Sequence, residues 1–131
     1  MSHIVPKGII LTTNDFKIQS GNVFINPNKI GRVPGMLLVF ANWCGHCKHF
    51  IPIFNDISKS LGSSFVCASI ESEELKSDGE KLSIALKVQG FPTIKFFDQN
   101  GKIIGNYDDN RDKGTILNTI CKVYHHCVET H

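Results

Sequence analysis

The sequence predicts an α/β fold in which a central mixed sheet of about four to five strands is flanked by helices. A continuous apolar run at residues 36–41, preceded by turn residues, is typical of a strand buried on both faces. From this run onward, the pattern predicts strand, helix, strand, helix, strand, strand and helix in that order. At 131 residues, the chain fits a single domain, residues 1–131, with one core.

The N-terminal segment, residues 1–35, has a less regular pattern. Residues 8–12 fit a short strand. The apolar residues Phe16 and Ile18 on one side and 23–25 on the other flank turn residues at 20–22, so a β-hairpin competes with a helix broken by turns. We favour the hairpin.

An amphipathic helix is predicted after the first core strand. Apolar side chains recur at three- and four-residue steps from Phe50 to Leu61, and Gly62 ends the pattern. Pro52 lies inside this helix and is expected to kink it.

The second half of the chain carries the remaining elements. Residues 71–80 are acidic and polar, which favours a solvated loop or a helix entry. The dipeptide Asn100-Gly101 favours a hairpin between two strands. The pattern predicts a strand at 65–70, a short helix at 82–88, strands at 93–97 and 102–107, and a C-terminal helix at 116–124.

Composition argues against several function classes. The net charge of +2 is too small to indicate nucleic-acid binding, and no basic run with interleaved aromatic residues occurs. The longest apolar stretch is far shorter than the roughly 20 residues that cross a membrane. Residues 1–7 lack the apolar region of a secretory signal, and residues 128–131 are not an ER-retention tetrapeptide. We therefore expect a cytoplasmic protein.

Cys44 and Cys47 form a Cys-x-x-Cys pair where a predicted strand gives way to a helix. The chain has five cysteines, and an odd number argues against a secreted disulfide framework. In a reducing compartment, such a pair is typically catalytic, redox-sensing or metal-binding. We interpret Cys44 and Cys47 as a redox-active dithiol.

The residues around the pair favour thiolate chemistry. Only a thiolate attacks a disulfide, and the unpaired N–H groups and dipole of the following helix stabilise an anion at Cys44. Cys47, one turn into the helix, is placed to resolve a mixed disulfide. His46, when protonated, adds a positive charge that stabilises the reduced form. The pair is therefore expected to be an oxidant.

Residues beyond the pair extend the pattern to a family. The run 43–48, Trp-Cys-Gly-His-Cys-Lys, resembles the active site of the protein disulfide isomerase branch of thioredoxin-fold proteins. Pro52 matches the helix-kinking proline of that family, and residues 90–93 resemble its cis-proline loop. The resemblance implies a thioredoxin fold with residues 1–35 as an atypical N-terminal segment, 36–120 as the family core, and 121–131 as the end of the C-terminal helix and its tail.

The same resemblance implies a function. The chain is expected to be an enzyme, a protein thiol–disulfide oxidoreductase on the oxidising or isomerising side. Cys44 is then the nucleophile, Cys47 resolves, and His46 tunes the thiolate. Arg111 matches an arginine that modulates the cysteines, and Pro92 is expected to be cis. The residues expected to line the substrate groove are Trp43, Gly90, Phe91 and Pro92.

Expected partners follow from this chemistry. They are polypeptide thiols and disulfides, with a redox protein or glutathione as the source of oxidising or reducing equivalents. No cofactor, metal, nucleic acid or membrane is expected, and the chain is expected to be a monomer.

Two positions depart from the family pattern. Family members bury an acidic residue six positions before the first cysteine, where this chain has Leu38, and Ser69 stands where they carry a partner lysine. The joint loss is coherent, because one remaining charge would be buried without a partner. In the family that acid accepts the proton of the second cysteine, so Cys47 is expected to lose its proton more slowly here.

Two other function classes stay open. The first is a binding module in which the same fold serves as an adaptor or redox sensor. The second is a zinc site, because several residues of ligand type lie close together near the C-terminus. These residues are Cys121, His125, His126, Cys127 and His131.

The remaining cysteines and acidic residues are expected to have no chemical role. Cys67 and Cys121 are expected to pack in the core as small apolar residues. Cys127 is expected to be an idle surface cysteine, with a third redox thiol or a site of intermolecular disulfides as the alternatives. The acidic residues at 71–74 are expected to be solvated.

Overall fold

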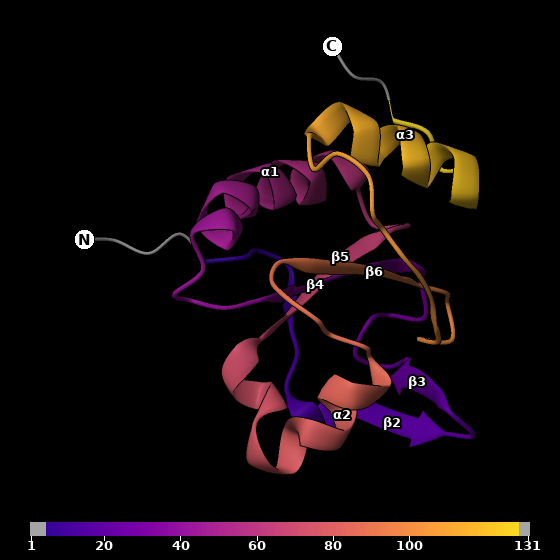
Figure 1. Cartoon of the computed structure of the whole chain (residues 1–131). Helices are drawn as coiled ribbons and strands as arrows, with labels where there is room; N and C mark the ends of the chain where they lie inside the picture. The colour runs from indigo at the N-terminus through magenta and orange to yellow at the C-terminus, as the bar shows by residue number, and fades with distance from the viewer. Residues whose placement is uncertain (1–4, 129–131) are drawn as a thin grey trace.

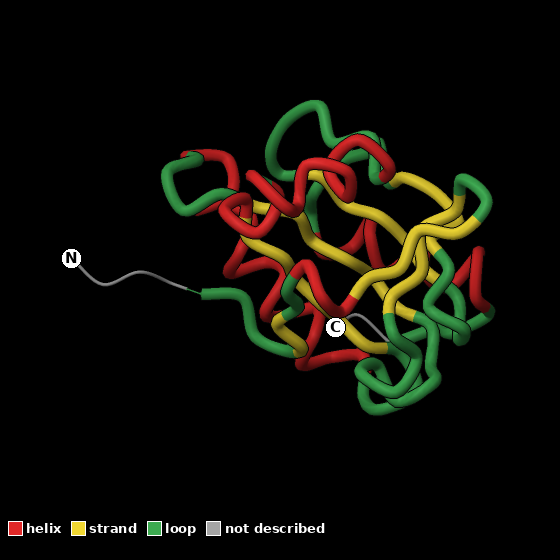
Figure 2. The backbone as a smooth tube through the Cα atoms, turned by 90° about the horizontal axis from the view of Figure 1, so that it is seen from below, coloured by secondary structure: helices red, strands yellow, loops and turns green. Residues whose placement is uncertain are grey.

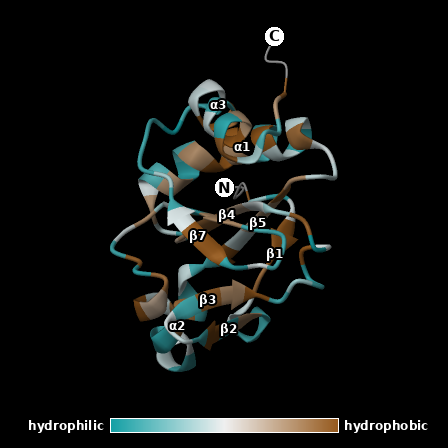
Figure 3. Ribbon diagram, turned by 90° about the vertical axis from the view of Figure 1, so that its right-hand side faces the viewer, coloured by the Kyte–Doolittle hydropathy of each residue, from teal (hydrophilic) through white to brown (hydrophobic). Residues whose placement is uncertain are grey.

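The structure, a computed structural model, describes residues 5–128 and has three layers. Helices α1 (Gly45–Leu61) and α3 (Lys113–Tyr124) cover one face of a five-stranded sheet. Helix α2 (Glu80–Ala85) and a separate hairpin lie on the other face (Figure 1). A side view shows the same layering (Figure 3). Within residues 5–128, none of the helices combines the length and apolarity needed to cross a bilayer.

The central sheet is mixed, as predicted. Its strands, in spatial order, are β1 (Ile9–Ile10), β5 (Val66–Glu71), β4 (Gly35–Phe40), β6 (Thr93–Phe97) and β7 (Ile103–Asn106). Strands β1 and β4 run parallel to β5, whereas β6 is antiparallel to both β4 and β7. Seen from below, the strands cross the middle of the molecule with helices around them (Figure 2).

Strand β4 divides the core into two clusters. Successive side chains of a strand point to opposite faces, so Leu38 packs beneath α1 and α3 while Leu37 packs toward α2. All residues of β4 are buried, which explains the unbroken apolar run in the sequence. Cys67 of β5 is buried on the α1 side, as expected, and this burial raises the pKa of its thiol to about 12.

The N-terminal segment contains the hairpin that the sequence favours. Strands β2 (Phe16–Gln19) and β3 (Asn22–Ile25) pair antiparallel across a two-residue turn. Both turn residues, Ser20 and Gly21, have positive φ, which matches the twist of the flanking strands. The short strand predicted at 8–12 is confirmed over Ile9–Ile10 only.

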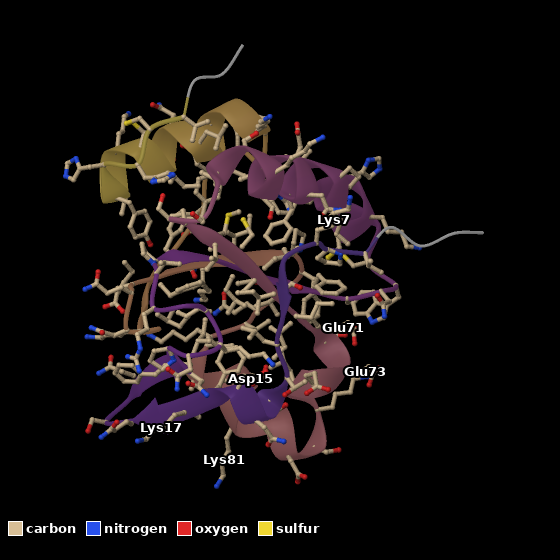
Figure 4. All side chains as sticks on the ribbon, turned by 180° about the vertical axis from the view of Figure 1, so that it is seen from behind. Lys7, Asp15, Lys17, Glu71, Glu73 and Lys81 are labelled. Carbon is tan, nitrogen blue, oxygen red and sulfur yellow. A yellow bond between two sulfur atoms is a disulfide. The ribbon has the colours of Figure 1, made fainter. Side chains whose placement is uncertain are left out.

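The acidic residues at 71–74 are not simply solvated, so that expectation is wrong. Two short 3₁₀ helices, Ser72–Leu75 and Ser77–Gly79, follow β5. Glu74 accepts a hydrogen bond from the backbone N–H of Thr13 at 2.8 Å, which ties this segment to the N-terminal part of the chain. Among residues 71–74, only Glu73 is exposed, and Figure 4 shows it beside Glu71.

The C-terminal cysteines form a disulfide, which corrects two expectations. Helix α3 ends at Tyr124, and His125 adopts a left-handed conformation that turns the chain back. This turn brings Cys127 to Cys121, with Cα atoms 4.3 Å apart, and their sulfurs are bonded. Cys121 is therefore not a packed thiol, and Cys127 is not a free one.

The same disulfide removes both sulfur ligands from the zinc interpretation. His126 has other contacts, because its ring nitrogens lie 3.2 Å from the Leu61 carbonyl oxygen and 3.2 Å from the Ser64 hydroxyl. Residues 5–128 contain no group of three or more possible metal ligands, and His131 lies outside the described residues.

Replacing Cys127 by serine is expected to lower the free energy of unfolding by about 2 kcal/mol. The disulfide spans a sequence separation of 6, and closing so short a loop removes a limited amount of unfolded-state entropy. Urea denaturation under oxidising conditions measures the difference. Under reducing conditions, the variant and the parent should unfold together, and equal stability under both conditions would contradict the prediction.

Candidate active site

Cys44 begins helix α1. Its backbone is extended (φ −84°, ψ 118°), as an N-cap residue requires, and its carbonyl accepts the first helical hydrogen bond from Lys48 N at 3.1 Å. Its Sγ accepts a hydrogen bond from the backbone N–H of Cys47 at 3.2 Å. The sulfur thus lies at the positive end of a 17-residue helix, where a thiolate is stabilised by the N–H groups and the dipole.

Cys47 differs from Cys44 in its surroundings. Cys44 keeps 6% of its surface exposed and Cys47 keeps none, and both are free thiols. Burial raises the pKa of Cys47 to about 12, and the hydrogen bond with Cys44 acts in the same direction. The charge of Arg111 opposes this shift without overcoming it. Cys47 therefore keeps its proton at neutral pH.

The loop before β6 faces the cysteines from a distant part of the sequence. Its Phe91–Pro92 peptide bond is cis, as expected. The Cys44 Sγ lies 3.5 Å from the Phe91 carbonyl oxygen, to which the thiol can donate. The rings of Trp43 and Phe91 meet edge to face with centroids 5.7 Å apart. Trp43 is nevertheless 68% exposed, so this aromatic pair presents apolar surface to solvent beside the sulfur.

Two hollows lie beside residues that flank the cysteine pair. A groove of about 410 Å³ is lined by Gly90, Phe91, Pro92 and Arg111, among other residues. A smaller hollow of about 130 Å³ is lined by His46, His49, Phe50, Ile53 and Arg111. Arg111 lines both hollows. The structure thus brings together all eight residues singled out from the sequence: Trp43, Cys44, His46, Cys47, Gly90, Phe91, Pro92 and Arg111.

The two departures from the family pattern are neighbours in space. Leu38 of β4 pairs in register with Ser69 of β5, and both are almost fully buried. Leu38 belongs to the same apolar cluster as Cys47. Within residues 5–128, the Ser69 hydroxyl oxygen is the only buried side-chain nitrogen or oxygen atom without a hydrogen-bond partner. An unpaired buried hydroxyl is costly.

Glu71 supports the turn before Cys44, a role missed in the sequence. Its carboxylate accepts hydrogen bonds from Asn42 N at 3.2 Å, from Ser72 Oγ at 2.9 Å and from Glu73 N at 2.9 Å. Partial burial raises the pKa of Glu71, but these hydrogen bonds outweigh burial and hold it below the usual value. In the sequence, the signal for this role was an acidic residue at the end of a buried strand.

The chain is similar to known proteins over most of its length. A family model described as Thioredoxin matches residues 28–122. The chain is 32% identical to protein disulfide-isomerase erp38 of Neurospora crassa over 90 residues, which cover 68% of this chain and 24% of that protein. It is 34% identical to protein disulfide-isomerase of Zea mays over 97 residues, which cover 71% of this chain and 18% of that protein. The matched region spans about a quarter or less of the length of these relatives.

A solved structure agrees in fold. Human ERp44 superposes with a TM-score of 0.69 at 15% sequence identity, covering 92% of this chain and 31% of that one. At this identity, the likeness concerns the fold alone. The thioredoxin fold predicted from the sequence is confirmed.

Proposed function

The chain belongs to the thioredoxin family, and on that basis we propose that it is a protein thiol–disulfide oxidoreductase acting through Cys44 and Cys47. The observation that carries the proposal is the position of the Cys44 sulfur. It lies at the start of α1, accepts the Cys47 N–H and faces the Phe91 carbonyl beside exposed aromatic surface. This arrangement favours a thiolate next to a surface on which an extended polypeptide can lie.

The proposed reaction has two exchange steps. The Cys44 thiolate attacks one sulfur of a substrate disulfide, forming a mixed disulfide while the substrate S–S bond breaks and its other sulfur leaves as a thiolate. Cys47 then loses its proton and attacks the Cys44 sulfur, which forms the Cys44–Cys47 disulfide and releases the second substrate thiolate. The reverse sequence oxidises two substrate thiols. A redox protein or glutathione resets the pair.

His46 and Arg111 are proposed to support this chemistry through charge. Both line the small hollow beside the start of α1. A protonated His46 stabilises the anionic form of Cys44, and Arg111 opposes the burial that raises the pKa of Cys47. Neither residue is required to form or break a bond.

The direction of electron flow is proposed to be oxidising or isomerising. Stabilising a thiolate at Cys44 stabilises the reduced pair, which makes the disulfide a stronger oxidant. We expect a reduction potential of about −180 mV, near protein disulfide isomerase, rather than about −270 mV, near thioredoxin. Equilibration with glutathione buffers measures it. The Cys127→Ser variant serves as control, because it removes the second disulfide from the titration. A value near the thioredoxin end contradicts the oxidising assignment.

A binding module is the second candidate. The observation that favours it is the apolar Leu38 and the unpaired Ser69 hydroxyl in the positions of the family's acid and lysine. Without that acid, resolution by Cys47 is expected to be slow, and a chain with weak exchange activity can still act as an adaptor that binds polypeptide non-covalently on its exposed aromatic surface. The Cys44 variant discussed below separates the two candidates.

A further inference from the structure

Lys95 of β6 is a nearly buried cation on the face of the sheet away from the dithiol. Its side chain is only 6% exposed. In register it pairs with Leu37 of β4, whose side chain lies in the cluster beneath α2 and the β2–β3 hairpin. Cys44 and Cys47 belong to the cluster on the opposite face. The Lys95 side chain therefore lies on the face of the sheet that α2 and the hairpin cover, away from Cys44 and Cys47.

The ammonium group of Lys95 has no partner among residues 5–128. It makes no hydrogen bond and no ion pair with any described residue, although Lys29, Lys76 and Lys113 each pair with a carboxylate. Most of the residue is buried, but its Nζ is not among the fully buried unpartnered atoms of residues 5–128, so the ammonium keeps contact with solvent at the end of a buried stem. Partial burial disfavours the charged form, so a negative group beside this ammonium would be favourable.

The side chain opens into a pocket of about 320 Å³, which we call the Lys95 pocket. Lys87, a second lysine, also lines the pocket, as do Asn22 and Asn106, whose side chains carry amide groups. None of the residues that line the pocket is acidic. The full lining is Gly21, Asn22, Val23, Ala85, Leu86, Lys87, Lys95, Ile103, Ile104, Gly105 and Asn106.

We propose that the Lys95 pocket binds a small oxyanion, the phosphate or carboxylate group of a ligand. Lys95 and Lys87 both line the pocket and supply its two positive charges. The amides of Asn22 and Asn106 supply neutral donors for the remaining oxygens. Charge-assisted hydrogen bonds to an oxyanion are roughly twice as strong as neutral ones, which offsets the burial of the lysine.

The charges around Lys95 agree with this assignment. Burial lowers the pKa of Lys95, and the nearby Lys87 lowers it further. Asp108 lines the neighbouring groove, and its negative charge raises the pKa of Lys95. It forms no ion pair with Lys95. A bound oxyanion would compensate both lysines.

The test uses thermal unfolding of the full chain in a zwitterionic buffer. Inorganic phosphate and acetate are added separately, with chloride at equal ionic strength as reference. Bound ligand raises the melting temperature in a saturable way. Phosphate also stabilises folded proteins generally by exclusion from their surface, so a comparison between variants is required. The expected result is a saturable rise for the parent with phosphate, with acetate, or with both.

Lys95→Met is the decisive variant, and Lys81→Met is its matched control. Lys81 lies on the adjacent α2 but points away from the body of the molecule (Figure 4) and does not line the pocket. Lys95→Met is expected to weaken oxyanion binding at least about tenfold, while Lys81→Met binds as the parent does. Equal responses from the two variants overturn the proposal, as does a parent that responds to phosphate, acetate and chloride alike.

Two further measurements keep the result unambiguous. Amide chemical shifts during a phosphate or acetate titration should change at Gly21, Lys87 and Gly105, whereas changes spread over exposed lysines contradict the proposal. Lys95→Met keeps a buried apolar stem of similar length and removes a partly desolvated charge, so it is expected to fold and to be about as stable as the parent without oxyanion. Its disulfide-exchange rate should be unchanged, which separates this site from the proposed function.

Discussion

Replacing Cys44 by serine is expected to lower disulfide-exchange turnover by about a thousandfold or more. A serine hydroxyl is not ionised at neutral pH and cannot form a disulfide, so the first exchange step is lost. The smaller oxygen can still occupy the N-cap position and accept the Cys47 N–H, so the fold is expected to persist. Insulin reduction and reactivation of a scrambled substrate measure the loss.

Cys127→Ser is the matched control for this experiment. It also replaces one cysteine by serine, but at the C-terminal disulfide, where the candidate site is not involved. It is expected to retain exchange activity. If Cys44→Ser instead keeps full turnover, the proposed function is wrong. If the parent itself shows no turnover while both proteins bind polypeptide equally, the chain is a binding module.

Replacing Leu38 by glutamate is expected to speed release of a mixed disulfide at neutral pH by about tenfold or more, the scale of a general base. Position 38 lies in the same cluster as Cys47, and its register neighbour Ser69 has a hydroxyl free to donate. A carboxylate there can accept the Cys47 proton, which burial otherwise retains by raising the pKa of that thiol to about 12. Single-turnover release of a Cys44-linked peptide measures the rate.

The pH profile distinguishes a base from a structural effect. In the parent, release is expected to rise about tenfold per pH unit, because the thiolate fraction of Cys47 grows tenfold per unit below its pKa. In Leu38→Glu the profile should flatten. Leu38→Gln is the control, since it has similar shape without a base, and it should retain the steep profile. Unchanged release in Leu38→Glu would count against this account.

A glutamate at position 38 also carries a stability cost. The site is fully buried, and an unpaired charge there is unfavourable. Adding Ser69→Lys supplies a partner in register, so the double variant is expected to recover stability relative to Leu38→Glu alone. Urea denaturation of both variants checks this directly.

The sequence by itself determined the features that depend on local pattern. The apolar run at 36–41 predicted the buried central strand, because a strand covered on both faces needs apolar residues at every position. The turn at Ser20-Gly21 favoured the hairpin, because its two residues set the twist locally. Cys44 follows a predicted strand and precedes a predicted helix, so the local pattern predicted its sulfur at the start of α1.

Only the tertiary structure decided how side chains far apart or on turned segments pair. Cys127 meets Cys121 because His125 turns the chain back after α3, a turn that spacing alone did not reveal. Glu71 supports the turn before Cys44 across parallel strands. Lys95 has no ion-pair partner among residues 5–128, because the sheet directs it into a pocket whose lining contains no acidic residue. Burial follows from local pattern, but pairing depends on which groups the completed fold places within hydrogen-bonding distance.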